Sequence, residues 1–155
     1  MSKPADPSLL LEAWLAFLRA HSRVVPRVSQ ELEIACEISL AWFDVLQQLS
    51  LAPECRRRMT DLADAVLLSK SGLTRLVDRI EAAGLVNRAA VPGNRRSLYV
   101  QLTPEGRRLV AKARPAVQRS VADHFGRQLS EAELATLRDS LARLAQVSTL
   151  EPDGV

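Results

Sequence analysis

The apolar residues between positions 60 and 103 change their spacing part-way, and this change constrains the fold more than any other feature. From 73 to 80 they recur at intervals of three and four residues, the period of an amphipathic helix. From Leu85 to Val91 and from Ser97 to Thr103 the pattern favours strands, and Pro92-Gly93-Asn94 between them is typical of a hairpin turn. With a short helix and turn before them, these elements predict a winged helix-turn-helix.

Side chains that accept hydrogen bonds mark the expected helix starts. Gly84 supplies a left-handed stop for the helix that Ser69 is expected to cap. Pro26 should kink or end the first helix, and Pro115 should kink the helix that follows the hairpin. The expected N-caps are Asp6 or Ser8, Ser39, Thr60, Ser69, Thr103 and Ser130, the last forming a capping box with Glu133.

The first predicted helix has almost no polar face. The ten residues from Leu9 to Leu18 carry a single charge, so several sides of this helix must be covered by other apolar surface. In the last helix, Leu134, Leu137, Leu141 and Leu144 form a narrow seam suited to pairing with another helix. We expect a second copy of the chain to be the cover, so the terminal helices should form a homodimer interface.

The length and composition fit one domain. The chain has 155 residues, 47% of them apolar, which is enough for a core of its own, and the low aromatic content of 4% favours packed helices. We expect a mostly α-helical fold with a small β-hairpin wing. Residues 8–50 and 104–147 should be dimerisation helices, 51–103 the winged helix-turn-helix lobe, and 1–7 and 148–155 disordered tails.

Basic residues gather in the middle of the chain. Between Glu54 and Arg108 there are eleven Lys or Arg against six Asp or Glu, whereas the remainder is slightly acidic and the whole chain carries only +3. A basic module on a near-neutral scaffold is typical of a protein that binds a polyanion. A chance fluctuation of a few charges gives the same split, so the motifs must decide between the two.

One face of the predicted helix over 69–80 is suited to DNA. If the apolar stripe faces the core, the opposite face near the helix start presents Lys70, Ser71, Thr74 and Arg75. These side chains donate to phosphates and base edges, and the helix N-terminus itself favours anions. Such a face alone is typical of any solvated helix. The helix comes directly before an arginine-bearing hairpin, and both lie within the basic segment from Glu54 to Arg108. This arrangement favours DNA binding.

Several motifs together resemble those of one known family. The stretches Thr60–Asp64 and Ser69–Val86, followed by Asn94-Arg95-Arg96, Leu102-Thr103 and Gly106, are similar to the helix-turn-helix and wing of the MarR transcriptional regulators. The resemblance covers roughly residues 9–147. It implies a triangular homodimer that regulates nearby genes, as a repressor in our prediction, through a pseudo-palindromic operator on double-stranded DNA.

The resemblance also assigns roles to single residues. Arg95 corresponds to the wing arginine that enters the minor groove, and Asp78 to the acid that orients the wing by pairing with a second wing arginine, Arg96. A solvent-exposed charge is the alternative for Asp78. Asn94 departs from the family, which usually has an acid there. With phosphate contacts from the basic run included, the expected DNA-binding residues are Arg56, Arg57, Arg58, Ser69, Lys70, Ser71, Thr74, Arg75, Arg95 and Arg96.

Many members of the family release DNA when a small phenolic or aromatic acid binds between the dimer helices and the DNA-binding lobe. The resemblance therefore implies a possible effector site here. The alternative to an effector site is that the aromatic side chains pack within the fold and the charged ones are exposed to solvent. The expected pocket residues are Trp14, Phe17, His21 and Trp42, with Arg19 and Arg23 nearby.

Other function classes lack their motifs. His21 and His124 lie far apart, and there is no glycine-rich phosphate loop or nucleophile motif, so we expect no enzyme, cofactor or metal site. Cys36 and Cys55 are expected to be inert thiols, with a redox switch as the alternative. Without an apolar run of 18 residues or a signal peptide, we expect a cytoplasmic protein with no membrane contact. A winged-helix interaction module that has lost DNA binding remains the alternative, favoured by Asn94.

Overall fold

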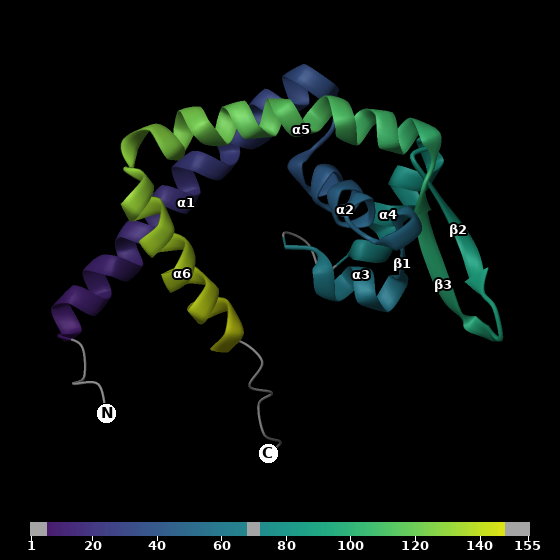
Figure 1. Cartoon of the computed structure of the whole chain (residues 1–155), viewed down its shortest axis with the longest axis horizontal. Helices are drawn as coiled ribbons and strands as arrows, with labels where there is room; N and C mark the ends of the chain where they lie inside the picture. The colour runs from purple at the N-terminus through teal and green to yellow at the C-terminus, as the bar shows by residue number, and fades with distance from the viewer. Residues whose placement is uncertain (1–5, 68–71, 148–155) are drawn as a thin grey trace, which may run out of the picture.

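The computed structural model describes residues 6–67 and 72–147, without the side chains of 94–96 (Figure 1). The predicted disordered tails therefore lie almost wholly outside the described residues. The elements in chain order are α1 (Pro7–Cys36), α2 (Leu40–Ser50), η1 (Pro53–Cys55), β1 (Arg56–Arg58), α3 (Met59–Ala65), α4 (Leu73–Ala82), β2 (Val86–Val91), β3 (Asn94–Leu102), α5 (Pro104–His124), η2 (Gly126–Gln128) and α6 (Glu131–Val147).

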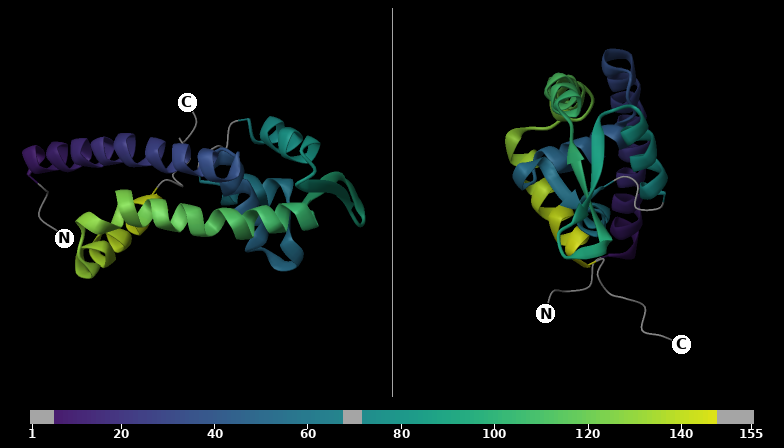
Figure 2. Two further views of the ribbon diagram at one scale, coloured as in Figure 1. Left: turned by 90° about the horizontal axis from the view of Figure 1, so that it is seen from above. Right: turned by 90° about the vertical axis from the view of Figure 1, so that its right-hand side faces the viewer.

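Two long helices organise the molecule. Helices α1 and α5 lie side by side along much of its length (Figure 2). The lobe made of α2, α3, α4 and the sheet lies beside the N-terminal part of α5, whereas α6 and the N-terminal half of α1 lie at the other end (Figure 1). The fold is therefore mostly helical with a small antiparallel sheet, as the sequence predicts.

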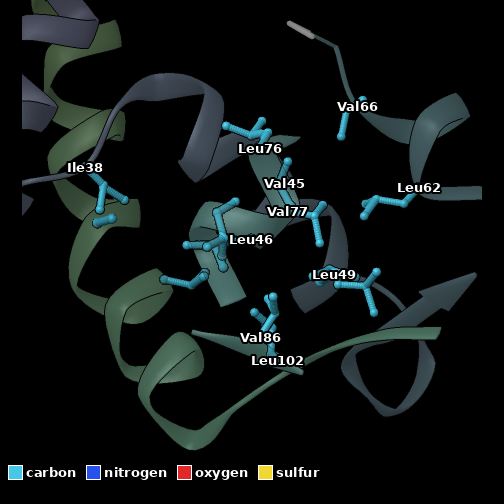
Figure 3. Packing of buried hydrophobic residues seen from close by; sticks show 14 of the residues in the cluster. Ile38, Val45, Leu46, Leu49, Leu62, Val66, Leu76, Val77, Val86 and Leu102 are labelled. Carbon is cyan, nitrogen blue, oxygen red and sulfur yellow. The ribbon is translucent and has the colours of Figure 1, made fainter. Parts of the chain in front are cut away.

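The hydrophobic core lies inside the lobe and extends to α5. Figure 3 shows Leu46 and Leu49 of α2 packed near Leu62 of α3, Val77 of α4 and Val86 of β2. Each of these side chains is fully buried, which stabilises the fold by about 1.5–3 kcal/mol per residue. All four residues of the predicted α4 stripe are buried, namely Leu73, Leu76, Val77 and Ile80. The helical period therefore identified the core face of α4 correctly.

The sheet has three strands in the order β1-β3-β2, all antiparallel. The predicted hairpin is present as β2 and β3, with a register shift between Ala90 and Val91. Strand β1 was not predicted: Arg56 to Arg58 pair with Gln101 to Tyr99 on the other edge of β3. Three consecutive arginines have no alternating pattern, and the pairing depends on the free edge of β3, so local sequence carried no signal for this strand.

Most of the predicted helix caps are present. The side chains of Asp6, Ser39 and Thr103 accept hydrogen bonds from the first turns of α1, α2 and α5. The prediction for Thr60 is wrong, because α3 begins at Met59 and the Thr60 hydroxyl bonds the carboxylate of Asp61 instead. Ser69 lies outside the described residues, and α4 begins at Leu73 after Gly72, whose φ is 80°.

Neither internal proline ends its helix. Helix α1 continues through Pro26 for its full 30 residues, and α5 continues through Pro115. A proline inside a helix removes one hydrogen bond and crowds the preceding turn, at a cost of about 3 kcal/mol. Beyond Pro26 the side chains of Val28 and Leu32 are buried, so packing offsets this cost. Of the two outcomes expected at Pro26, the end of α1 is therefore wrong, and the kinks expected at Pro26 and Pro115 stay predictions.

The N-terminal part of α1 exposes a large apolar surface. Its large apolar side chains are 39–65% exposed, including Trp14 at 55% and Phe17 at 45%. Leu144 of α6, at the same end of the molecule, is 68% exposed. A continuous apolar surface of this kind is typical of an interface with another chain.

The start of α5 is joined to the lobe by a close backbone contact. A Cβ atom placed on Gly106 would lie 2.1 Å from the carbonyl oxygen of Leu85. The Thr103 hydroxyl donates to the carbonyl of Gly84 at 2.7 Å and accepts from the N–H of Gly106 at 3.0 Å. Gly84 follows α4 and Leu85 precedes β2. This joint therefore attaches α5 to the end of α4 and to the wing.

The substitution Gly106→Ala tests this joint. The added methyl group would collide with a backbone carbonyl that cannot move without displacing β2, so we expect the free energy of unfolding to fall by about 2–3 kcal/mol. Gly126→Ala is the matched control, because its nearest neighbouring atom would lie 3.8 Å away. Urea unfolding measures both. Equal stability of the two variants would contradict the close packing at Gly106.

The capping box at the start of α6 predicts a pH dependence. The Glu133 carboxylate accepts from the Ser130 hydroxyl at 2.7 Å and from the Ser130 N–H at 2.8 Å, and these two bonds hold its pKa below the ordinary 4.5. A lowered pKa adds stability that is present above pH 4.5 and is lost as the pH falls through the folded value. Wild type should therefore be more stable than Glu133→Gln at pH 7, with the difference shrinking under acid.

Thermal melts of both proteins between pH 7 and pH 3 measure this difference. Glu131→Gln removes a charge from the same turn without removing the bonds to Ser130, and so serves as the control. A stability difference for Glu133→Gln that is the same at every pH would rule out the ionised carboxylate as its cause.

Candidate nucleic-acid interface

Helix α4 presents a polar face to solvent. Its apolar stripe is buried in the hydrophobic core of the lobe, and this places Thr74 and Arg75 on the exposed side near the helix start. Both belong to an open depression of about 410 Å³ between α3 and α4, together with Thr60 and Gly72. Ser69, Lys70 and Ser71, also predicted to contact DNA, lie outside the described residues.

The β-hairpin forms a projection beside this helix. Strands β2 and β3 extend away from the lobe and are joined at Pro92-Gly93, where Gly93 has a φ of 78° that favours glycine (Figure 1). The backbones of Arg95 and Arg96 belong to β3 close to this turn. Their side chains are not described, so their contact with the minor groove stays a prediction.

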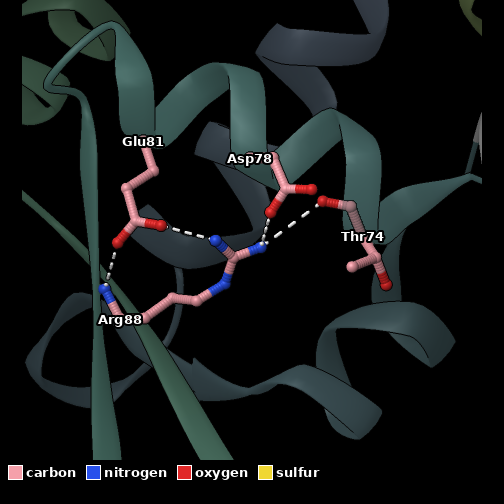
Figure 4. A network of polar contacts seen from close by, with 4 residues as sticks. All are labelled: Thr74, Asp78, Glu81 and Arg88. Carbon is pink, nitrogen blue, oxygen red and sulfur yellow. Dashed lines mark hydrogen bonds and ion pairs between the residues drawn. The ribbon is translucent and has the colours of Figure 1, made fainter.

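Arg88 ties the hairpin to α4 (Figure 4). From β2 its guanidinium reaches Asp78 at 2.6 Å and Glu81 at 2.5 Å, and it also donates to the Thr74 carbonyl at 3.4 Å. Its backbone N–H donates to the other oxygen of Glu81 at 2.9 Å. Asp78 therefore does bind the wing, through Arg88. The Arg96 side chain lies outside the description, and the predicted Asp78–Arg96 pair is untested.

The charge of Arg88 is stabilised by its partners. Burial of its guanidinium opposes the charge, but the hydrogen bonds and negative charges of Asp78 and Glu81 outweigh it, so the pKa of Arg88 is raised above its ordinary value. The arginine side chain is 19% exposed, Glu81 35% and Asp78 55%. The contact with Glu81 is therefore the less screened of the two, and it should contribute more to fixing the wing.

The three arginines of β1 have different surroundings. Arg57 is half-buried and donates from Nε to the carbonyl of Gln48 at 3.0 Å. Arg56 pairs with Glu54 and lies 4.7 Å above the ring of Tyr99. Arg58 is exposed. Arg58 is therefore the member of the predicted basic run that is best placed to contact a phosphate.

Three of the four predicted effector residues lie together on α1. The rings of Trp14 and Phe17 are 6.0 Å apart, and those of Phe17 and His21 are 6.4 Å apart. Trp42 belongs to α2 and packs against the core of the lobe instead. The single chain therefore has one aromatic row on α1 and a separate tryptophan in the lobe, and the predicted pocket is untested.

Sequence reasoning missed two polar residues that position the lobe. The first is Arg88, and the spacing of Asp78 and Glu81 on one face of α4 was a signal that a cation lies opposite them. The second is Asp44, a buried carboxyl group in α2 that accepts from the N–H of Leu67 at 2.7 Å. Its signal was one acid within the apolar segment that forms α2.

Comparison with known proteins agrees with this geometry. The MarR family model matches residues 37–97, which include α2, α3, α4 and most of the hairpin. The HTH-type transcriptional regulator PecS of Dickeya dadantii is 29% identical over 153 residues, covering 89% of this chain and 84% of the relative. The crystal structure of AbsC, a MarR family transcriptional regulator from Streptomyces coelicolor, superposes with a TM-score of 0.82 at 28% identity, covering 94% of this chain and 97% of that one.

The chain is therefore similar to MarR family regulators in the sequence of its DNA-binding lobe and in its fold. A further similar structure is that of Bordetella bronchiseptica BpsR, whose DNA binding is regulated by 6-hydroxynicotinic acid. It is 25% identical with a TM-score of 0.76, covering 92% of this chain and 98% of BpsR. Other curated regulators match over shorter stretches, and this chain spans 56–59% of their length.

The matched proteins are transcriptional regulators, and the fold is the one that such regulators have. Proteins of this kind are not enzymes. None of the helices in the described part of the chain is long and apolar enough to cross a membrane. In residues 6–67 and 72–147 no group of three or more His, Cys, Asp or Glu side chains could hold a metal ion.

The substitution Arg88→Gln tests the attachment of the wing. It removes the guanidinium and leaves Asp78 and Glu81 without their cation, so we expect the free energy of unfolding to fall by about 1–2 kcal/mol. Arg108→Gln is the control, because its pair with Glu105 on α5 is exposed and should cost less than about 0.5 kcal/mol. Guanidinium unfolding at neutral pH measures both. Equal losses would mean that the Arg88 contacts are no stronger than a surface ion pair.

Proposed function

We propose that this protein is a MarR-family, sequence-specific transcriptional regulator that binds double-stranded DNA as a homodimer, on a pseudo-palindromic operator, as a repressor. The observation that carries the proposal is that α4 presents Thr74 and Arg75 beside a hairpin that Arg88 clamps to the same helix. A recognition helix in the major groove and a wing beside it then contact adjacent parts of one duplex. Such a regulator acts in the cytoplasm, as the sequence predicts.

The proposed contacts divide into two kinds. Thr74 and Arg75, with Ser71, read base edges in the major groove, where hydroxyl and guanidinium groups find suitable partners. Arg58 and Lys70, with the wing arginines Arg95 and Arg96, bind phosphates or the minor groove. Arg56 and Arg57 contribute less than the sequence predicts, because their guanidinium groups already contact Glu54, Tyr99 and Gln48.

The exposed apolar surface of α1 supports the proposed homodimer. Its exposed leucines, Trp14 and Phe17 need a cover, and α6 at the same end carries Leu144. A second copy would cover these residues and place two α4 helices on one duplex. Their separation would be about 34 Å if they occupy successive major grooves.

A small aromatic acid is the proposed effector. The relative BpsR, whose DNA binding is regulated by 6-hydroxynicotinic acid, supports this chemistry. In this chain Trp14, Phe17 and His21 form a row that can stack on an aromatic ring, and Trp42 would face it from the lobe. Binding there would change the spacing of the two lobes and so lower the affinity for the operator.

The substitution Arg95→Ala tests the proposal. We expect it to weaken binding to a selected DNA site by about 1–3 kcal/mol and to lower the salt dependence of the affinity, because a groove and phosphate contact is lost. The operator would first be found by selection from genomic DNA. Fluorescence anisotropy on that site and on a scrambled duplex, at two salt concentrations, then measures the effect. Arg138→Ala, an exposed arginine on α6, is the control.

Preference of the wild type for the selected site, lost in Arg95→Ala and kept in Arg138→Ala, would support a regulator. Equal and weak binding of the wild type to every duplex would favour the interaction module instead. Sedimentation equilibrium of the same preparation checks the homodimer.

A further inference from the structure

We propose that the depression between α3 and α4 is a pocket for the 5-methyl group of a thymine in the operator. The pocket makes thymine the preferred base at one position of each half-site. This inference rests on the proposed DNA-binding function and deepens it, because it adds an apolar contact to the polar contacts of Thr74 and Arg75.

The depression has an apolar interior and a polar edge. Its apolar members are the more buried ones: Leu73 is 4% exposed, and Met59 and Ala63 are partly buried and pack against the core. Thr74 and Arg75, which also line it, are exposed. The volume of about 410 Å³ has room for a methyl group and for the edge of the ring that carries it. An apolar surface of this kind gains free energy when another apolar group covers it.

Gly72 leaves one side of the depression open. This residue is part of the lining, and a Cβ atom placed on it would have no other atom within 4 Å. Its φ of 80° is a conformation that favours glycine over residues with a side chain. The backbone at the start of α4 therefore keeps side-chain atoms out of the space beside Leu73.

The position of the depression limits what can fill it. Thr74 and Arg75 form part of its edge, and the proposed function places both in the major groove, so the depression opens toward the edges of the base pairs. These edges carry hydrogen-bond donors and acceptors, and the apolar group among them is the 5-methyl group of thymine. Another base would place a donor or acceptor against Met59 and Ala63 without a partner, at a cost in free energy. Thymine is therefore the base that fits.

Deoxyuridine tests the pocket, because it differs from thymidine only in lacking the methyl group. The selected site is rebuilt from synthetic strands, which contain no 5-methylcytosine, and each thymine of one half-site is replaced by uracil in turn. We expect the affinity of the wild type to fall about fourfold at one of these positions, the factor that burial of one methyl group gives. It should change little at the others. Fluorescence anisotropy measures each duplex.

Ala63→Leu fills the depression from the protein side. Leucine is also a good helix former, and its side chain occupies the space that the methyl group would take. This variant should therefore bind the thymine and uracil duplexes with equal affinity. Ala111→Leu makes the same exchange at an exposed position of α5, outside the depression, and should keep the wild-type preference for thymine. Urea unfolding checks that both variants are folded.

A cross-link replaces the variant if Ala63→Leu does not fold. 5-Iodouracil at the sensitive position carries iodine where thymine carries its methyl group, and on irradiation it joins to the protein group in contact with it. Mass spectrometry of the wild-type complex should find this cross-link on α3 or on the first turn of α4.

A selected site in which no thymine is sensitive to uracil would overturn the pocket and leave the proposed function standing. A uracil effect that persists in Ala63→Leu would also overturn it, because the methyl group would then act elsewhere or through the shape of the DNA. An effect that is lost equally in Ala111→Leu, or a cross-link outside α3 and the start of α4, would do the same. If the wild type prefers no DNA site at all, the proposed function fails and this inference fails with it.

Discussion

The contact between Gly106 and the Leu85 carbonyl is the constraint on which the arrangement of the whole molecule depends. It brings the start of α5 against the segment that joins α4 to β2, at a separation that no larger residue permits. The hydrogen bonds of Thr103 close the same joint, and Arg114 attaches α5 to Gln47 and Ser50 of α2 further along. Helix α5 is therefore attached to the lobe at two places, and the lobe follows any movement of this helix.

Within the lobe, α4 is held by two different kinds of interaction. Its apolar stripe is packed in the core, and its outer flank is bound by Arg88 through Asp78 and Glu81. Apolar packing supplies most of the stability but little direction, whereas the polar contacts have fixed geometry and so determine how the helix is oriented.

Local sequence predicted the features that depend on local physics. The period of the apolar residues identified the buried face of α4, and Thr103 and Ser130 cap their helices as expected. Features that depend on distant contacts were missed or wrong. Strand β1 needs the edge of β3, and the continuity of α1 through Pro26 needs packing that comes from elsewhere in the chain.

The residues of the candidate site also fall into those that local sequence predicted and those that depend on distant contacts. Thr74 and Arg75 were found because a helix with one buried face must expose the other, and the structure places both on the exposed side. The resemblance named Arg96 as the partner of Asp78, and the contact with Arg88 was missed because strand register decides which residues of β2 face α4. Arg88, directly paired with Val100 in the sheet, is the one that the register brings there.

If a second copy covers the exposed half of α1, as proposed, the amount of protein and its DNA-binding activity are linked. Helix α1 is about 45 Å long, and the leucines and aromatic residues of its first half have no cover within the described chain. With a second copy as the cover, the folded length of α1 depends on chain concentration. At low concentration the population of pairs falls with the square of the number of chains. Occupancy of an operator would then fall more steeply than the protein level itself.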